Sequence, residues 1–278
     1  MYEKPLVSVI VPTRNSAKTL EVCLISIKRQ TYPNIELIIV DNYSKDETPK
    51  IARRYTNLVF TKGPERNIQR LLGASIAKGK YLLFIDSDME LPPTLIESAV
   101  KKCEYEGFDA VILPEVSLGS GFWADCRKLE KLCYLNDPYM EYANRFMKAK
   151  VYHAVGGYNP AFIGADDVDI HERIKNAGYR ITRIQDTIKH HEVTSLIGLL
   201  RKSYVYGQDI PFFVAKYPKT GLKVYFPIRT AYLRNMKLFI KDPIHGLGLI
   251  FLKSSQFIVA GFGFFARVLR GWRYKEAT

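Results

Sequence analysis

The chain has 278 residues, of which 47% are hydrophobic and 25% charged. This composition is typical of a folded globular protein and excludes a disordered chain. The length suits one large domain, or one domain with an appendage. The four cysteines form no CxxC pair and have no metal-binding spacing, so we interpret them as structural thiols of a reducing compartment.

The net charge of +13 is concentrated at the C-terminal end of the chain. Residues 192–278 contain 14 Lys and Arg against 4 Asp and Glu, a net charge of +10, and they are rich in aromatic residues. We therefore expect one domain over residues 1–192 and a basic, aromatic segment over 193–278. The N-terminal stretch has no basic leader before its apolar run, so no signal peptide is evident.

The first part of the chain alternates between predicted strands and helices. Residues 7–13 (VSVIVPT) are apolar and β-branched without alternation, which is typical of a strand buried on both faces. The same reading predicts, in chain order, a helix over 17–30, a strand over 35–40, a helix over 46–55, a strand over 58–61, a helix over 66–77, a strand over 81–85, a helix over 94–106 and a strand over 110–114. This rhythm predicts an α/β fold with an open, mostly parallel sheet flanked by helices, whose ligands bind beyond the carboxyl ends of the strands.

Two carboxylates, Asp86 and Asp88, follow directly on the buried stretch LLFI. Like charges at the end of a core strand repel each other and lose hydration, so something must compensate for them. A divalent cation would do so. The chain contains no GxGxxG or GxxxxGK[ST] motif, which argues against a dinucleotide fold or a P-loop.

The series VSVIVPTRN, ELIIVDNYSKD, ERN, FIDSD and GGYNPAFIGADDVD resembles glycosyltransferase family 2, which has the GT-A fold. The resemblance covers roughly residues 6–192 and extends to membrane-associated sugar transferases related to the dolichol-phosphate mannose synthases. Five elements in the right order are more specific than the DXD motif alone. The chain departs from the family after the second strand, where a second acid is common and Asn42 stands here.

This resemblance implies an inverting transfer of a sugar from a nucleotide sugar, with Mg²⁺ or Mn²⁺ as the cofactor. Asp88 would ligate the metal ion, and Asp86 would contact the ribose or a metal-bound water. Asp41 would accept a hydrogen bond from the nucleobase. The complete set expected to bind the nucleotide sugar is Pro12, Thr13, Asp41, Arg66, Asp86, Ser87 and Asp88.

A second acidic cluster, Asp166, Asp167 and Asp169, begins a predicted helix. Acids at a helix N-terminus suit the macrodipole, but one cap does not need three of them. In the family, the second acid of the corresponding pair is the general base that deprotonates the acceptor hydroxyl. By this match Asp167 is the base and Asp166 positions the acceptor or the base, while Asp169 stays structural.

Two histidines, His190 and His191, follow a predicted strand over 182–188. Many GT-A enzymes bring a late histidine to the metal or to the diphosphate. We prefer His190 as the metal ligand, because its alternation with Ile184 and Ile188 places it on the sheet face.

The C-terminal segment favours a membrane surface as partner. Residues 195–206 are amphipathic, and the apolar run over 244–269 has an uninterrupted piece only over 254–266, shorter than the roughly 20 residues of a spanning helix. An interfacial helix at the cytoplasmic side of the cell membrane, with peripheral or monotopic attachment, fits this pattern. A nucleic-acid partner is not expected, because single-strand grooves do not require apolar runs such as FIVAGFGFF.

Two activities are compatible with these motifs. In the first, the sugar moves to a lipid-linked glycan or glycolipid, with GDP-mannose as the donor that family habits suggest and UDP-sugars left open. In the alternative, a polyprenyl-phosphate sugar synthase, the acceptor phosphate would be held by Arg127, Lys128, Arg201 and Lys202. The acid pair favours the first activity, because an ionised phosphate needs no base. A non-catalytic scaffold would not need both acidic clusters.

Overall fold

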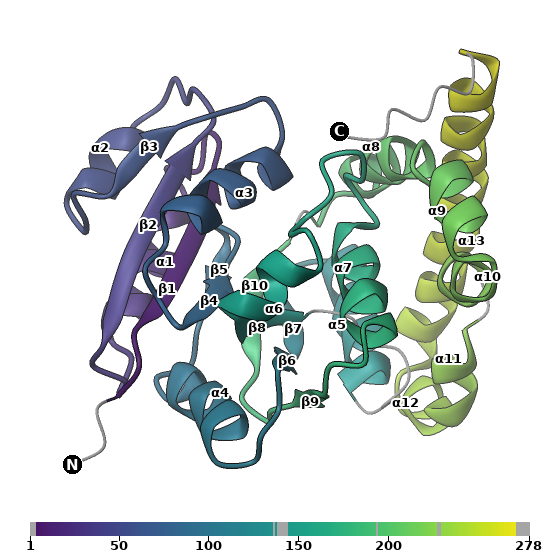
Figure 1. The fold of residues 1–278 in the computed structure, drawn as a ribbon. Coiled ribbons are helices and arrows are strands. Elements are labelled where there is room, and N and C mark those ends of the chain that lie inside the picture. The colour runs from purple at the N-terminus through teal and green to yellow at the C-terminus, as the bar shows by residue number, and fades with distance from the viewer. Residues whose placement is uncertain (1–3, 136, 138–143, 193, 227–228, 271–278) are drawn as a thin grey trace. The chain divides into compact units, whose positions relative to one another are not determined.

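A computed structural model of the chain describes residues 4–135, 137, 144–192, 194–226 and 229–270 (Figure 1). The chain divides into two compact units. Unit 1 comprises Met1–Pro114, Tyr142–Pro160 and Asp166–His190, and unit 2 comprises Glu115–Glu141, Ala161–Ala165 and His191–Thr278. These units differ from the expected division at residue 192, because a helix within 115–141 packs with the C-terminal helices.

Unit 1 is built on a seven-stranded sheet with the strand order β3-β2-β1-β4-β8-β6-β9. Its strands are β1 (Val7–Thr13), β2 (Ile35–Asp41), β3 (Val59–Thr61), β4 (Tyr81–Phe84), β6 (Ala110–Ile112), β8 (Asn144–Lys148) and β9 (Ile181–Arg183). Neighbouring strands are parallel except at β8, which runs antiparallel to β4 and to β6. Strand β1 pairs with β2 so that Thr13 lies opposite Asp41, and both residues reach the same edge of the sheet.

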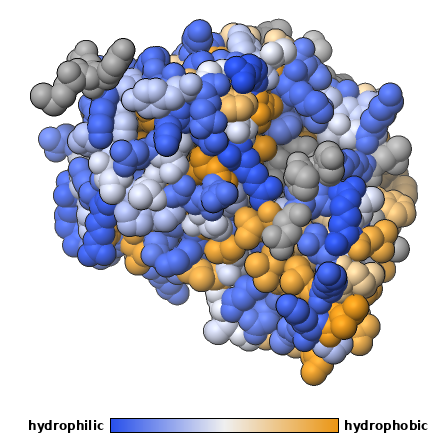
Figure 2. Space-filling view, turned by 90° about the horizontal axis from the view of Figure 1, so that it is seen from below, coloured by the Kyte–Doolittle hydropathy of each residue, from blue (hydrophilic) through white to orange (hydrophobic). Residues whose placement is uncertain are grey.

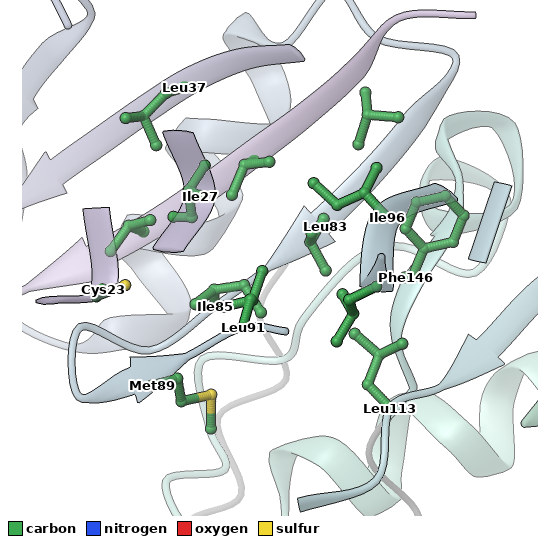
Figure 3. Packing of buried hydrophobic residues seen from close by; sticks show 14 of the residues in the cluster. Cys23, Ile27, Leu37, Leu83, Ile85, Met89, Leu91, Ile96, Leu113 and Phe146 are labelled. Atoms are coloured by element: carbon green, nitrogen blue, oxygen red, sulfur yellow. The ribbon is translucent and has the colours of Figure 1, made fainter. Parts of the chain in front are cut away.

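Helices cover both faces of this sheet. They are α1 (Leu20–Lys28), α2 (Thr48–Arg53), α3 (Arg66–Ile76), α4 (Leu95–Glu104), α6 (Ala149–Ala154) and α7 (Asp166–Asn176). Val9 and Leu83 point to the face covered by α1, α2 and α4, whereas the next residues, Ile10 and Phe84, point to the face covered by α3, α6 and α7. Figure 3 shows part of the first cluster, to which Ile27 of α1, Leu83 of β4 and Ile96 of α4 contribute. The predicted α/β class with a mostly parallel sheet is confirmed.

One predicted strand is wrong in its extent. The expected strand over 182–188 is two strands, β9 and β10 (Ile188–His191), because the polar residues 185–187 interrupt the apolar pattern. Strand β10 pairs antiparallel with the short strand β5 (Met89–Glu90), and His190 lies opposite Met89. The register therefore carries His190 to the segment that follows Asp86 and Asp88.

Unit 2 is mainly helical. Its elements are β7 (Glu115–Leu118), α5 (Phe122–Leu135), α8 (Leu196–Gly207), α9 (Ile210–Lys216), α10 (Pro218–Tyr225), α11 (Thr230–Arg234), α12 (Met236–Lys241) and α13 (Pro243–Leu269). Its apolar core joins Cys126 and Cys133 of α5 to Leu199 of α8 and to Leu249 and Leu252 of α13. All four cysteines of the chain are buried free thiols, in line with the structural role expected for them.

Candidate active site

Asp86 lies in unit 1 between two buried arginines. Arg70 of α3 donates to Oδ1 of Asp86 at 2.7 Å, and Nη1 of Arg145 on β8 lies 3.3 Å from Oδ2. Arg145 arrives there because β8 pairs antiparallel with β4, with Phe146 opposite Leu83. We expected a divalent cation to compensate for the charges of Asp86 and Asp88; at Asp86 these two guanidinium groups also supply positive charge.

The acid pair lies beside the same arginines. Arg66 makes a bidentate pair with Asp166, at 3.1 Å from Nε and 2.9 Å from Nη2, and Arg70 adds a third contact at 2.8 Å. The side chain of Asp166 is 2% exposed, whereas that of Asp167 is 27% exposed. Nη2 of Arg145 lies 3.3 Å from Asp167. Asp167 is therefore the member of the pair that a substrate can reach.

The environments of these carboxylates separate their proton affinities. Burial alone would raise the pKa of Asp86, but the positive charges of Arg70 and Arg145 hold that pKa well below its usual range. For Asp167 burial is the largest effect, and together with the negative charge of Asp166 it raises the pKa in spite of Arg145. A fixed anion and a carboxylate with raised proton affinity thus lie on either side of Arg145.

Arg70 lies inside unit 1, between acidic and aromatic side chains. It is fully buried, and its guanidinium lies 4.6 Å from the ring centroid of Tyr158. The hydroxyl of Tyr158 in turn donates to Oδ1 of Asp167 at 3.4 Å. Burial alone would lower the pKa of Arg70, but Asp86 and Asp166 raise it, so Arg70 carries a permanent charge.

Asp88 and His190 meet at the other side of the DXD segment. Nε2 of His190 lies 3.3 Å from Oδ1 of Asp88, whose side chain is 36% exposed. In the described part of the chain no three His, Cys, Asp or Glu side chains converge into a metal site. The carboxylate of Asp88 suits a Mg²⁺ or Mn²⁺ ion, which would take its remaining ligands from substrate phosphates and water; the imidazole of His190 would suit Mn²⁺ better than Mg²⁺.

Three residues expected to bind the nucleotide, Pro12, Thr13 and Asp41, lie at the ends of β1 and β2. Pro12 and Thr13 end β1, and the hydroxyl of Thr13 donates to Asp41 at 2.8 Å. Ser44 also donates to Asp41, through its hydroxyl at 2.6 Å and its backbone N–H at 2.8 Å. Asp41 is 3% exposed, so its carboxylate orders this edge. Ser87 donates to Ser16 at 2.8 Å.

Sequence reasoning did not identify Arg70, Arg145 or Gln69. Gln69 donates to the backbone carbonyls of Thr13 and Val40, which joins the ends of β1 and β2. The sequence could have indicated Arg70, because it lies four residues after Arg66 and therefore on the same side of the predicted helix. Arg145 had none, because only strand pairing brings it to Asp86.

The chain also matches known proteins in sequence. The family model described as glycosyl transferase family 2 matches residues 8–168. Glycosyltransferase AglE of Haloferax volcanii is 28% identical over 220 residues, which cover 73% of this chain and 72% of AglE. A PGL/p-HBAD biosynthesis glycosyltransferase of Mycobacterium bovis is 28% identical over 194 residues, which cover 66% of this chain and 75% of that protein.

Solved structures share the fold. Mannosyltransferase PcManGT from Pyrobaculum calidifontis, in complex with GDP-Man and Mn²⁺, has a TM-score of 0.68 at 18% identity and covers 98% of this chain and 89% of its own. S. aureus TarS 1-349 has a TM-score of 0.55 at 16% identity, covering 97% of this chain and 93% of its own. The family match takes in more than half of the chain, including Asp86, Asp88, Asp166 and Asp167. The chain therefore belongs to glycosyl transferase family 2 and is a glycosyltransferase.

Proposed function

We propose that the protein moves a sugar from a nucleotide sugar to a hydroxyl of a lipid-linked glycan or glycolipid, with inversion at the anomeric carbon. The observation that carries this proposal is Asp167, a carboxylate with a raised pKa that is partly exposed in an otherwise buried cluster. A general base needs access to the acceptor hydroxyl and a proton affinity above that of an ordinary aspartate. Asp167 meets both requirements.

The neighbouring groups keep Asp167 in position. Asp166 is saturated by Arg66 and Arg70, so we assign it to holding these arginines and the N-terminus of α7 rather than to contacting the acceptor. Tyr158 donates to Asp167, and Arg145 links Asp167 to Asp86. Arg70 and Arg145 would thus hold the carboxylate of Asp86 in one orientation, in which it would contact the ribose.

We assign Asp88 and His190 to a Mg²⁺ or Mn²⁺ ion that would also bind the diphosphate. Such an ion stabilises the charge that grows on the diphosphate as the glycosidic bond breaks. Thr13 and Asp41 would face the nucleoside, with the backbone of Pro12 beside them. GDP-mannose is the first donor to try, since PcManGT is described with GDP-Man and Mn²⁺, and UDP-GlcNAc is the second, since TarS is described with it.

The membrane part of the proposal rests on unit 2. Among the described helices, α13 has the length and apolar composition needed to cross a membrane. Seven of its exposed apolar side chains recur at helical spacing: Ile244, Leu247, Phe251, Ile258, Phe262, Phe265 and Leu269. Ile250, Phe257 and Val268 are exposed beside them. Lys253 is turned away from this face and pairs with Glu130 at 3.0 Å. Figure 2 shows hydrophobic side chains gathered on the side of the molecule where α12 and α13 lie.

An interfacial position suits this surface better than a span. Exposed Lys237 and Lys241 on α12 accompany the apolar Ile240, and such basic residues favour an anionic leaflet. We therefore propose monotopic attachment at the cytoplasmic side of the cell membrane. Among the relatives, the support for a glycolipid acceptor is the name of the PGL/p-HBAD biosynthesis glycosyltransferase.

The alternative, a polyprenyl-phosphate sugar synthase, has less support. Arg127 was one of the four residues expected to hold the acceptor phosphate, but its side chain is half-buried and pairs with Glu130 and Glu192. Lys128 pairs with Asp125 at 2.8 Å. With these two cations engaged, only Arg201 and Lys202 of the proposed set are left for that role.

The test is Asp167→Asn, compared with wild type. Release of nucleoside diphosphate from GDP-mannose or UDP-GlcNAc is followed with Mn²⁺ and a total lipid extract. Turnover should fall by about 10² to 10⁴, the usual contribution of a general base. Donor affinity, measured by calorimetry, should change by less than about threefold. Retained turnover, or an equal loss of donor affinity, would contradict the assignment of Asp167 as the base.

A further inference from the structure

The acid pair is preceded by a short loop, residues 161–165, that belongs to unit 2. Two consecutive backbone N–H groups of this loop, those of Ile163 and Gly164, donate to one carboxylate oxygen, Oδ2 of Asp209, at 2.6 and 2.7 Å. Asp209 is 4% exposed. A buried carboxylate that accepts two N–H groups is a strong anchor, because bonds to a charged acceptor are about twice as strong as neutral ones.

Asp209 lies at a helix N-cap, but its side chain does not make the usual capping hydrogen bond. It is the N-cap residue of α9, and an aspartate there normally accepts an N–H from the first turn of its own helix. Its side chain makes no such cap bond. The carboxylate is directed to residues 163 and 164, 46 and 45 positions away in sequence.

Two aromatic side chains of unit 2 also pack against this loop: Tyr206 and Phe213. A Cβ at Gly164 would lie 2.3 Å from Cγ of Tyr206 at the end of α8, so the ring lies directly against the loop backbone. On the α9 side, Phe162 and Phe213 are fully buried and their ring centroids are 5.9 Å apart. The loop is thus seated on the junction of α8 and α9, with Asp209 at its centre.

We propose that Asp209 is a positioning residue for transfer, which fixes the loop that runs directly into Asp166 and Asp167. One residue, Ala165, separates the anchored Gly164 from the start of α7, so a shift of the anchor moves the base relative to its acceptor. This inference rests on the proposed function of Asp167. A misplacement of about 1 Å at a reacting group lowers turnover by up to about 10².

The test compares Asp209→Ala with Asp209→Asn. Because one oxygen accepts both N–H groups, the amide oxygen of Asn can replace it, whereas Ala removes the anchor. We expect turnover of Asp209→Ala to fall by about 10- to 100-fold, with donor affinity within about twofold of wild type. Asp209→Asn should recover turnover to within about threefold. Hydrogen–deuterium exchange should speed up over residues 161–167 in the Ala variant only.

Asp137→Ala is the matched control. Asp137 is also a fully buried carboxylate of unit 2, where it pairs with Arg234 at 2.6 Å. Its loss should lower the melting temperature while leaving turnover per folded molecule and exchange of the 161–167 amides unchanged. The proposal is overturned if Asp209→Ala behaves like Asp137→Ala, or if donor affinity falls together with turnover.

A second variant covers the case in which Asp209→Ala does not fold. Gly164→Ala displaces the loop through Tyr206, whose Cβ and Cγ would lie 2.7 and 2.3 Å from the new Cβ, and should lower turnover; adding Tyr206→Gly, which removes both atoms, should restore it to within about threefold. Full turnover of Gly164→Ala alone would overturn the proposal. The Asp167→Asn result separates the two claims: if that variant keeps its turnover, the proposed function fails, whereas if it loses turnover and Asp209→Ala does not, only the positioning role fails.

Discussion

At the scale of single residues, Asp166 and Asp167 are chain neighbours with opposite environments. Asp166 is enclosed by Arg66 and Arg70 and carries a charge that these two residues balance. Asp167 has longer contacts, to Arg145 at 3.3 Å, to the hydroxyl of Tyr158 at 3.4 Å and to Arg70 at 3.9 Å, and burial raises its pKa. One peptide bond therefore separates a structural anion from a carboxylate suited to accept a proton.

This raised pKa predicts the acid limb of the rate profile. The base must be ionised, so activity should be lost as pH falls through the raised pKa, at a pH above the ordinary aspartate value of 3.8. Stability has the opposite pH dependence. Protonated Asp167 favours the folded state, so its stabilising contribution is present at low pH and is lost as pH rises through the raised pKa. Measurement of kcat/KM against pH locates the limb.

Substitution of Arg145 tests whether Asp167 controls the acid limb. Its positive charge lowers the pKa of Asp167, so Arg145→Met should move the acid limb to higher pH, while Arg145→Lys should leave it near the wild-type position. An acid limb that does not move in Arg145→Met would mean that a group other than Asp167 controls it.

At the scale of elements, two helices of unit 2 approach each other without intervening side chains. A Cβ at Gly263 of α13 would lie 2.1 Å from the carbonyl oxygen of Tyr204, and a Cβ at Gly207 of α8 would lie 2.2 Å from that of Ala260. These neighbours are backbone atoms, which cannot rotate away. Glycine at both positions therefore permits the close contact of α8 with α13.

We predict that Gly263→Ala destabilises the protein by about 1–3 kcal/mol, because overpacking outweighs the gain in helix propensity. Gly261→Ala, two residues earlier in α13, is the control. A Cβ at Gly261 meets no atom within 4 Å, so this substitution should stabilise the helix by about 0.5–1 kcal/mol. Urea unfolding of both variants measures the difference, and equal effects would refute the close contact.

At the scale of the whole molecule, α13 has two different faces. One face supplies Leu249 and Leu252 to the core of unit 2, and the other carries the exposed apolar residues. A deletion of α13 would therefore expose Cys126, Leu129 and Cys133 as well as remove the proposed membrane surface. Substitutions on the exposed face alone separate attachment from folding.

We expect the triple variant Leu247→Ser, Ile258→Ser and Phe262→Ser to bind anionic liposomes about 100-fold more weakly or worse. Full burial of each such side chain contributes about 1.5–3 kcal/mol, and about 1.4 kcal/mol corresponds to a factor of ten. Leu58→Ser with Tyr105→Ser, on exposed residues of unit 1, should bind like wild type. Flotation on phosphatidylserine-containing vesicles measures both.

Salt and alkali separate the modes of attachment. High salt should weaken wild-type binding only in part, because it screens charge but not apolar insertion. Alkaline carbonate should extract an interfacial protein from membranes, and resistance to it would indicate a span by α13. Unchanged binding of the triple variant would move the contact to another surface, for which exposed Ile197 of α8 is the next candidate.

Local pattern alone determined much of unit 1. Apolar β-branched runs predicted β1, β2 and β4, since a strand buried on both faces has no polar alternation. Each of these runs ends in a polar residue, and the parallel order brings such ends to one edge. Local pattern therefore predicted the α/β class, and the resemblance of the sequence motifs to the family named Asp88, Asp167 and His190 as candidates.

Only the tertiary structure decided which charges meet. Arg145 reaches Asp86 and Asp167 through the antiparallel register of β8 on β4, and Asp209 reaches Ile163 and Gly164 across 46 and 45 residues. The inward position of Lys253 likewise depends on packing against α5. Hydrophobic periodicity records which side of an element is buried, whereas ion pairs depend on the register between distant elements. A pattern in a single segment contains no information on that register.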